Sequence, residues 1–188
     1  MHLTLYLFFS MMLTALAAGA QALPLDERGK SGFYAVVRAD SLPAGLLYAH
    51  AKAWLHRRGY VLAGADSAAG RLEATHAFGV YDRGYITKRL HGKMNYRLTL
   101  EVKNGRYRSQ FTDFSFAYYQ DDRTGRPLPT GKTKPLEDLT APGWQKLWEA
   151  HRHDTQLTVT GLSAELKTAM LAVPKAPMLT QRTVSADW

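Results

Sequence analysis

The sequence predicts an α+β domain in which an antiparallel sheet of about five strands carries two helices packed on one face. Several segments alternate apolar and polar residues, as strands do when one sheet face packs and the other meets solvent. Two other segments have a single apolar stripe at helical spacing, so each can cover the packed face. The chain has 188 residues, of which 46% are hydrophobic, and can bury one core; we place a single domain at residues 33–173.

The N-terminus has the composition of a secretory signal peptide. Residues 1–22 contain no Lys, Arg, Asp or Glu, and an apolar run from Leu3 to Ala18 leads into small residues that a signal peptidase accepts. The run is short against the ~20 residues that span a bilayer. We therefore expect cleavage and a periplasmic or extracellular mature chain without a transmembrane segment. The alternative is an uncleaved N-terminal anchor.

The sequence contains no cysteine. Disulfides, thiolate metal sites, a thiol nucleophile and lipid attachment through cysteine are therefore excluded. We expect the mature domain to be soluble and to depend on its apolar core for stability. No cofactor is predicted.

The first predicted helix directly follows the first predicted strand. Residues 33–38 are a short β-type run, and the helix after them is capped by Asp40 or Ser41 and ends at Gly59. Its apolar stripe consists of Leu47, Ala51, Trp54 and Leu55. This stripe is predicted to be core.

Two further strands are predicted at residues 60–65 and 71–80, with a turn at residues 66–70 between them. In the second strand the even positions share one face. Four of them are apolar, namely Leu72, Ala74, Phe78 and Val80. His76 is the polar member of that face.

The strongest local pattern is a hairpin of residues 94–103 and 106–119. The dipeptide Asn104-Gly105 between the two runs readily takes the positive φ values of a tight turn. The second run changes its phase of alternation from odd to even positions. We therefore predict a β-bulge near Thr112 and Asp113.

The C-terminal third is predicted to combine a loop with a helix. Residues 121–139 are rich in Pro, Gly, Lys and Asp without periodicity, which predicts a solvated loop. A helix begins at Thr140, is kinked or broken within residues 155–161, and stops before Pro174. Residues 174–188 have no pattern and are predicted to be a flexible tail.

Three segments carry a resemblance to a known family: residues 47–55 in the first helix, residues 70–74, and residues 96–114 across the hairpin. The chain resembles the bacterial exported proteins of the domain of unknown function 4468 family, which is associated with a fold like the TATA-binding protein. The resemblance extends over roughly residues 33–173. It implies the fold and export, and it implies no catalytic residue because the family has no established activity. The name of the fold is no indication of DNA binding.

Positive charge is concentrated in the hairpin region. The formal net charge is +8, and residues 83–110 hold eight basic residues against the single acid Glu101, which is +7. The eight are Arg83, Lys88, Arg89, Lys93, Arg97, Lys103, Arg106 and Arg108. Arg97 and Lys103 are expected to share a sheet face with Arg106 or Arg108, depending on register, with tyrosines among them.

This pattern favours a binding or scaffold domain of the cell envelope over an enzyme. A basic, tyrosine-bearing face suits phosphate, uronate or carboxylate groups, so an anionic glycan, a lipid headgroup or an acidic protein surface is the expected partner. Export speaks against genomic DNA. The alternative interpretation is a solvated basic face that only keeps the protein soluble.

An enzyme with an unrecognised polar site is the second hypothesis. The motifs of phosphate loops, zinc helices and serine hydrolases are missing from the sequence. His76 and Asp113 could form an acid/base group together with Tyr85 or His91. The alternative for His76 is a buried histidine bonded to a backbone carbonyl.

The closest pair of histidines is His151 and His153. Their i, i+2 spacing points the rings to different sides of a helix, so a metal site would need ligands from elsewhere. No metal site is predicted.

Overall fold

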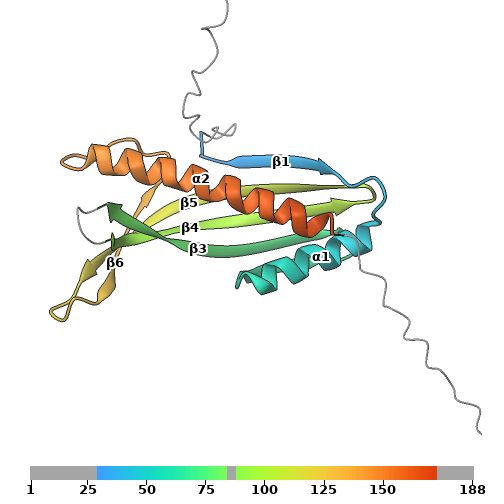
Figure 1. Ribbon diagram of the computed structural model, residues 1–188, viewed down its shortest axis with the longest axis horizontal. Coiled ribbons are helices and arrows are strands. Elements are labelled where there is room, and N and C mark those ends of the chain that lie inside the picture. Colours follow the sequence, from blue (N-terminus) through green and yellow to red (C-terminus); the bar gives the residue numbers. More distant parts are fainter. Residues whose placement is uncertain (1–28, 84–87, 173–188) are drawn as a thin grey trace, which may run out of the picture.

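The computed structural model describes residues 29–83 and 88–172, which form one antiparallel sheet and two helices (Figure 1). The elements are β1 (Phe33–Arg38), α1 (Ala44–Arg57), β2 (Val61–Asp66), β3 (Arg71–Arg83), β4 (Lys88–Lys103), β5 (Arg106–Asp121), β6 (Pro127–Pro135) and α2 (Gln145–Met170). The strand order is β1-β5-β4-β3-β2, and β6 pairs with the second half of β5. The predicted fold class is confirmed, with six strands where about five were expected.

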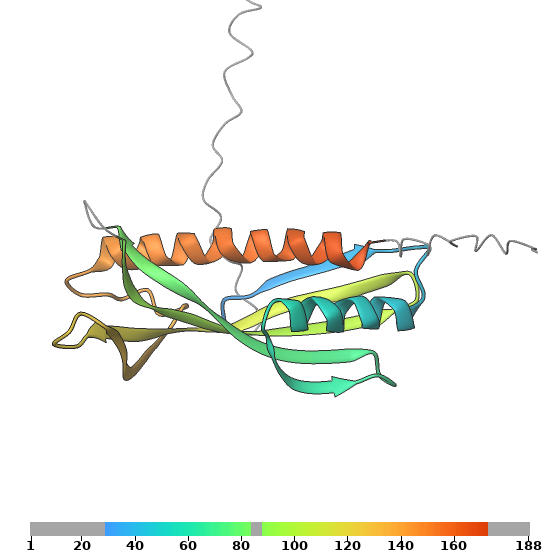
Figure 2. The ribbon, with the colours of Figure 1, turned by 60° about the horizontal axis from the view of Figure 1, so that its bottom comes forward.

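Both helices cover the same face of the sheet, as predicted (Figure 2). Along β4 the even positions from Met94 to Val102 are buried beneath the helices, and the odd positions between them point to the other side. Trp54 of α1 and Trp148 of α2 are fully buried in this core. We call the side beneath the helices the covered face and the opposite side the uncovered face.

The β4–β5 hairpin is confirmed, and its turn also caps α1. Gly105 has a positive φ of 72°. The side chain of Asn104 accepts a hydrogen bond of 2.8 Å from the N–H of Ala44, in the first turn of the helix. The predicted capping by Asp40 or Ser41 is wrong, because the chain passes through an extended Pro43 and the cap comes from another part of the sequence.

The end of α1 follows the prediction. Gly59 adopts a φ of 72°, its N–H donates to the carbonyl of His56, and the N–H of Tyr60 donates to the carbonyl of Leu55. This pair of bonds is a Schellman motif, which requires the left-handed conformation that glycine takes without strain.

The predicted bulge in β5 is also confirmed. Asp113 has a φ of 56°, and the β4–β5 register shifts between Asn95 and Arg97. Because of this extra residue, Phe111 and Phe114 both reach the covered face.

The predicted loop at residues 121–139 is wrong in part, because it contains β6. Pro127, Pro129 and Pro135 hide the strand from sequence inspection, yet they are tolerated because β6 is paired only to β5. Eight of its nine residues are exposed, so no apolar alternation appears in the sequence.

The predicted break in the last helix is wrong as well, and the start lies later, since α2 runs unbroken from Gln145 to Met170. The hydroxyls of Thr155, Thr158 and Thr160 each donate to the carbonyl four residues earlier. These bonds satisfy the hydroxyls within the helix, which lets the β-branched run remain helical.

Within residues 29–83 and 88–172, neither helix is long and apolar enough to cross a membrane. The predicted signal peptide at residues 1–22 and tail at residues 174–188 lie outside the described residues.

Candidate functional site

The basic residues predicted from the hairpin lie on the uncovered face. The register pairs Lys103 with Arg106 and Glu101 with Arg108, so all three predicted cations at this end share that face with Arg97. Lys93 also alternates onto it, and its ammonium lies 5.6 Å from the ring centre of Tyr119. Arg89 is exposed opposite Asp82. The side chains of Arg83 and Lys88 are outside the described part of the chain.

Three cations stand side by side at the hairpin end of this face. Arg38 of β1 pairs in register with Arg106 of β5, and Arg106 pairs with Lys103 of β4. Adjacent strands are about 4.8 Å apart, so the row spans about 10 Å. All three residues are exposed, and none forms an ion pair with a described residue. We call Arg38, Arg106 and Lys103 the cationic row.

Like charges directly opposite each other on neighbouring strands repel and destabilise a sheet. The sheet therefore gains nothing in stability from this row. Three neighbouring positive charges are therefore kept together here without a stabilising role in the sheet.

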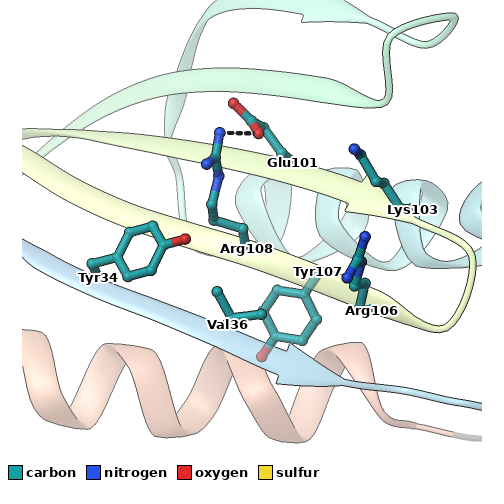
Figure 3. Close-up of a pocket in the computed structure, with 7 residues that line it drawn as sticks. All are labelled: Tyr34, Val36, Glu101, Lys103, Arg106, Tyr107 and Arg108. Atoms are coloured by element: carbon teal, nitrogen blue, oxygen red, sulfur yellow. Dashed lines mark hydrogen bonds and ion pairs between the residues drawn. The ribbon is translucent and has the colours of Figure 1, made fainter.

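A hollow of about 250 Å³ lies beside the cationic row (Figure 3). It is lined by Tyr34, Val36, Glu101, Lys103, Arg106, Tyr107 and Arg108. In Figure 3 Val36 lies between Tyr34 on one side and Arg106 on the other. The hollow thus combines an apolar floor with neighbouring positive charge.

Arg108 is held in place within the hollow. Its guanidinium donates to the carboxylate of Glu101 and lies 6.0 Å from the ring centre of Tyr34. Hydrogen bonding to the Tyr34 hydroxyl, and then to Glu101, raises the pKa of Arg108 above its usual value. These contacts orient the side chain and leave further N–H groups for a ligand.

The middle of the uncovered face differs, because its cations have partners. Arg97 lies 3.3 Å from Asp113 and 3.9 Å from Glu73. Arg71 forms ion pairs with Glu73 and Glu101. The charge of +7 counted along residues 83–110 is therefore not spread evenly over the face. Of those cations, Lys103 and Arg106 are the unpaired ones at this end, and Arg38 of β1 completes the cationic row.

Sequence inspection missed Arg38, Tyr34 and Val36. They alternate on β1, which pairs with β5 across about seventy residues of chain, and no local pattern reveals that register. The alternation itself, with Tyr34, Val36 and Arg38 on one face of residues 33–38, was the only available sign.

The residues of the alternative enzyme site do not come together. His76 pairs with Tyr96 on the covered face and stacks on Tyr60 at 4.6 Å between ring centres. Asp113 lies on the uncovered face, where it binds Arg97 and Lys30. The sheet separates the two groups, so no dyad forms.

Burial and then the charge of Arg58 lower the pKa of His76. The alternative prediction, a buried His76 bonded to a backbone carbonyl, also differs from the structure. His76 instead contacts the rings of Tyr60 and Tyr96. Tyr85 lies outside the described residues.

A second polar pair lies under the helices. The Nδ1 atom of His91 is 2.7 Å from the Nε2 atom of His151, which is fully buried. Aromatic rings surround the pair, among them Phe116 and Trp144. Burial and then the neighbouring His91 lower the pKa of His151 to about 4, and burial lowers that of His91.

His153 is exposed on the other side of α2, as the spacing predicted. Within the described residues, no three His, Asp or Glu side chains are grouped so as to hold a metal ion.

Comparison with known proteins places this geometry in a fold family. A domain of unknown function (DUF4468) with TBP-like fold matches residues 33–117. The crystal structure of a TBP-like protein from Parabacteroides distasonis matches this fold with a TM-score of 0.60. The two sequences are 16% identical, and the match covers 80% of this chain and 97% of that one. A DUF4468 family protein from Bacteroides ovatus is 15% identical with a TM-score of 0.62, covering 85% and 95%.

No curated protein matches the chain. At these identities the solved structures support the fold and carry no statement about activity.

Proposed function

We propose that this chain, which carries the DUF4468 domain with its TBP-like fold, is a binding domain for anionic groups and not an enzyme. The anion binds at the hairpin end of the uncovered face, between Arg38, Arg106 and Lys103. Carboxylate, sulfate and phosphate groups all fit this chemistry, whether a glycan, a lipid headgroup or a protein surface presents them.

One observation carries the proposal: three neighbouring strands each place a cation at the same register, and none of the three has a counter-ion among the described residues. In the middle of the same face, by contrast, Arg97 and Arg71 have carboxylate partners. The charges of the cationic row are uncompensated and can therefore attract an anionic partner. Neither helix covers this face of the sheet, which leaves room for one (Figure 2).

We also propose that the domain works outside the cytoplasm. The support is the composition of residues 1–22, which has the apolar run and small residues of a cleaved signal. Intact-mass measurement of the expressed protein from a periplasmic or culture fraction checks this, and a mass that still includes Met1 contradicts it.

Heparin affinity chromatography with two matched triple variants tests the binding proposal. The site variant combines Arg38→Gln, Lys103→Gln and Arg106→Gln. The control combines Arg123→Gln, Arg126→Gln and Lys132→Gln, three exposed residues in and around the β5–β6 turn. Each triple removes three charges from the formal +8, so the two share one net charge.

We expect the site variant to elute at clearly lower salt than the control, which stays near wild type. Salt screens exposed charges beyond about 8 Å at 0.15 M, so wild-type retention must itself fall with salt. Equal shifts in the two variants would mean that only net charge matters, and would refute a localised site.

A further inference from the structure

The hollow beside the cationic row exposes apolar surface as well as charge. Tyr34 and Val36 are each 55% exposed, at alternate positions of β1. Single exposed apolar residues are common, but these two line one hollow together with Arg106. The hollow therefore combines apolar and charged surface. At about 250 Å³ the hollow has room for one ring-sized group.

The hollow also contains a hydrogen-bond acceptor. Glu101 presents a carboxylate beside Arg108, and the hydroxyl of Tyr34 is nearby (Figure 3). A partner with anionic oxygens alone would leave the acceptor oxygens of Glu101 unused. A partner that also carries hydroxyl groups can donate to Glu101 and accept from Arg108.

We infer that the hollow binds an acidic sugar unit of a glycan, with its ring against Val36 and Tyr34 and its carboxylate or sulfate at Arg106 and Lys103. This inference rests on the proposed function and names its ligand. The apolar face of a sugar ring fits the apolar floor. Its hydroxyls match Glu101 and Arg108, and its acidic group meets the cationic row.

A flat anionic membrane fits this face less well than a glycan does. Glu73, Glu101 and Asp113 lie on the same side of the sheet as the cationic row. They neutralise arginines there, so only the hairpin end of the face offers unpaired positive charge to lipid headgroups. A chain that occupies only the hairpin end avoids two of these three carboxylates. The experiment must therefore distinguish binding to a membrane from binding to a glycan.

The experiment measures binding of the domain to a hexasaccharide of alternating glucuronate and N-acetylglucosamine by isothermal titration calorimetry. A neutral N-acetylglucosamine hexamer, a sulfated hexasaccharide and vesicles of phosphatidylglycerol are run beside it. Tyr34→Ala removes the stacking ring, and Tyr81→Ala is the matched control because Tyr81 is 48% exposed and lies outside the hollow.

We expect an acidic hexasaccharide to bind and the neutral hexamer to bind much more weakly. Tyr34→Ala should weaken binding about tenfold, since an aromatic contact is worth up to about 1.4 kcal/mol, which is a factor of ten. Tyr81→Ala should bind like wild type. Binding of the sulfated sugar in place of the uronate still supports the inference, because both are acidic sugars.

Three outcomes would overturn the inference alone: no acidic hexasaccharide binds, Tyr34→Ala binds one as well as wild type, or the vesicles bind more tightly than the sugars. In these cases the site triple variant would still elute early from heparin. If that triple variant is retained like its control, the proposed function itself fails. The two failures are thus distinguishable.

Discussion

The two faces of the sheet divide stability and charge between them. The covered face buries large aromatic side chains beneath the helices, with Phe116 fully buried among them. The uncovered face carries charged side chains that remain in water, including the cationic row. Because charge can change there without opening the core, substitutions on the two faces should affect stability very differently.

The largest expected effect is a substitution on the covered face. Phe116→Ala removes a fully buried ring that lies 5.5 Å from the ring centre of His151 and 5.8 Å from that of Trp148. We expect the free energy of unfolding to fall by about 3–5 kcal/mol. Urea unfolding at pH 7, followed by tryptophan fluorescence, measures it.

The matched substitution on the uncovered face is Tyr34→Ala. This side chain is 55% exposed, so its removal should cost less than about 1 kcal/mol. Similar losses for the two variants would show that the faces do not divide their roles in this way.

The same contrast explains how far sequence inspection reached. Alternation and Asn104-Gly105 predicted the hairpin because they are local signals, and the phase change predicted the bulge at Asp113. β6 was missed because its exposed, proline-containing residues are held by pairing to β5 alone. The threonines of α2 indicated a break because their hydroxyl bonds form only once the helix exists.

The site was predicted in half for the same reason. Composition located the basic hairpin. It could not show that Asp113 neutralises Arg97 or that Arg38 completes the cationic row, because both depend on pairing between strands. Charge counts along a chain therefore overstate the field of a sheet face, because neighbouring strands bring their own charges.

Acid pH is expected to lower the free energy of unfolding by an intermediate amount, through two histidines of the covered face. The pKa of His151 is lowered to about 4 and that of His91 is also lowered, while unfolded histidines titrate near 6.5. Between these values the unfolded chain binds more protons than the folded one, so stability falls as pH drops from 6.5 towards 4. The loss should be about 2–3 kcal/mol, measured as the urea midpoint at pH 7, 5.5 and 4.5.

Two substitutions on α2 separate this pair from other acid effects. His151→Phe removes the buried titrating ring and should flatten the dependence between pH 6.5 and 4.5. His153→Gln removes an exposed histidine two residues away and should leave the dependence as in wild type. An unchanged slope in His151→Phe would assign the acid sensitivity to other groups.

The smallest expected effect has a sign that tests the uncovered face directly. Arg106 stands between Arg38 and Lys103, so Arg106→Gln relieves repulsion and should leave stability unchanged or raise it by up to about 0.5 kcal/mol. Arg108→Gln, two residues along the same strand, loses the bond to Glu101 and the contact with the Tyr34 ring, and should lower stability by about 0.2–1 kcal/mol. Thermal midpoints of both variants at low salt measure this difference, and added salt should shrink it because it screens exposed charges. If Arg106→Gln proves the more destabilising of the two, Arg106 supports the sheet, and the cationic row is not the uncompensated charge from which an anion-binding role follows.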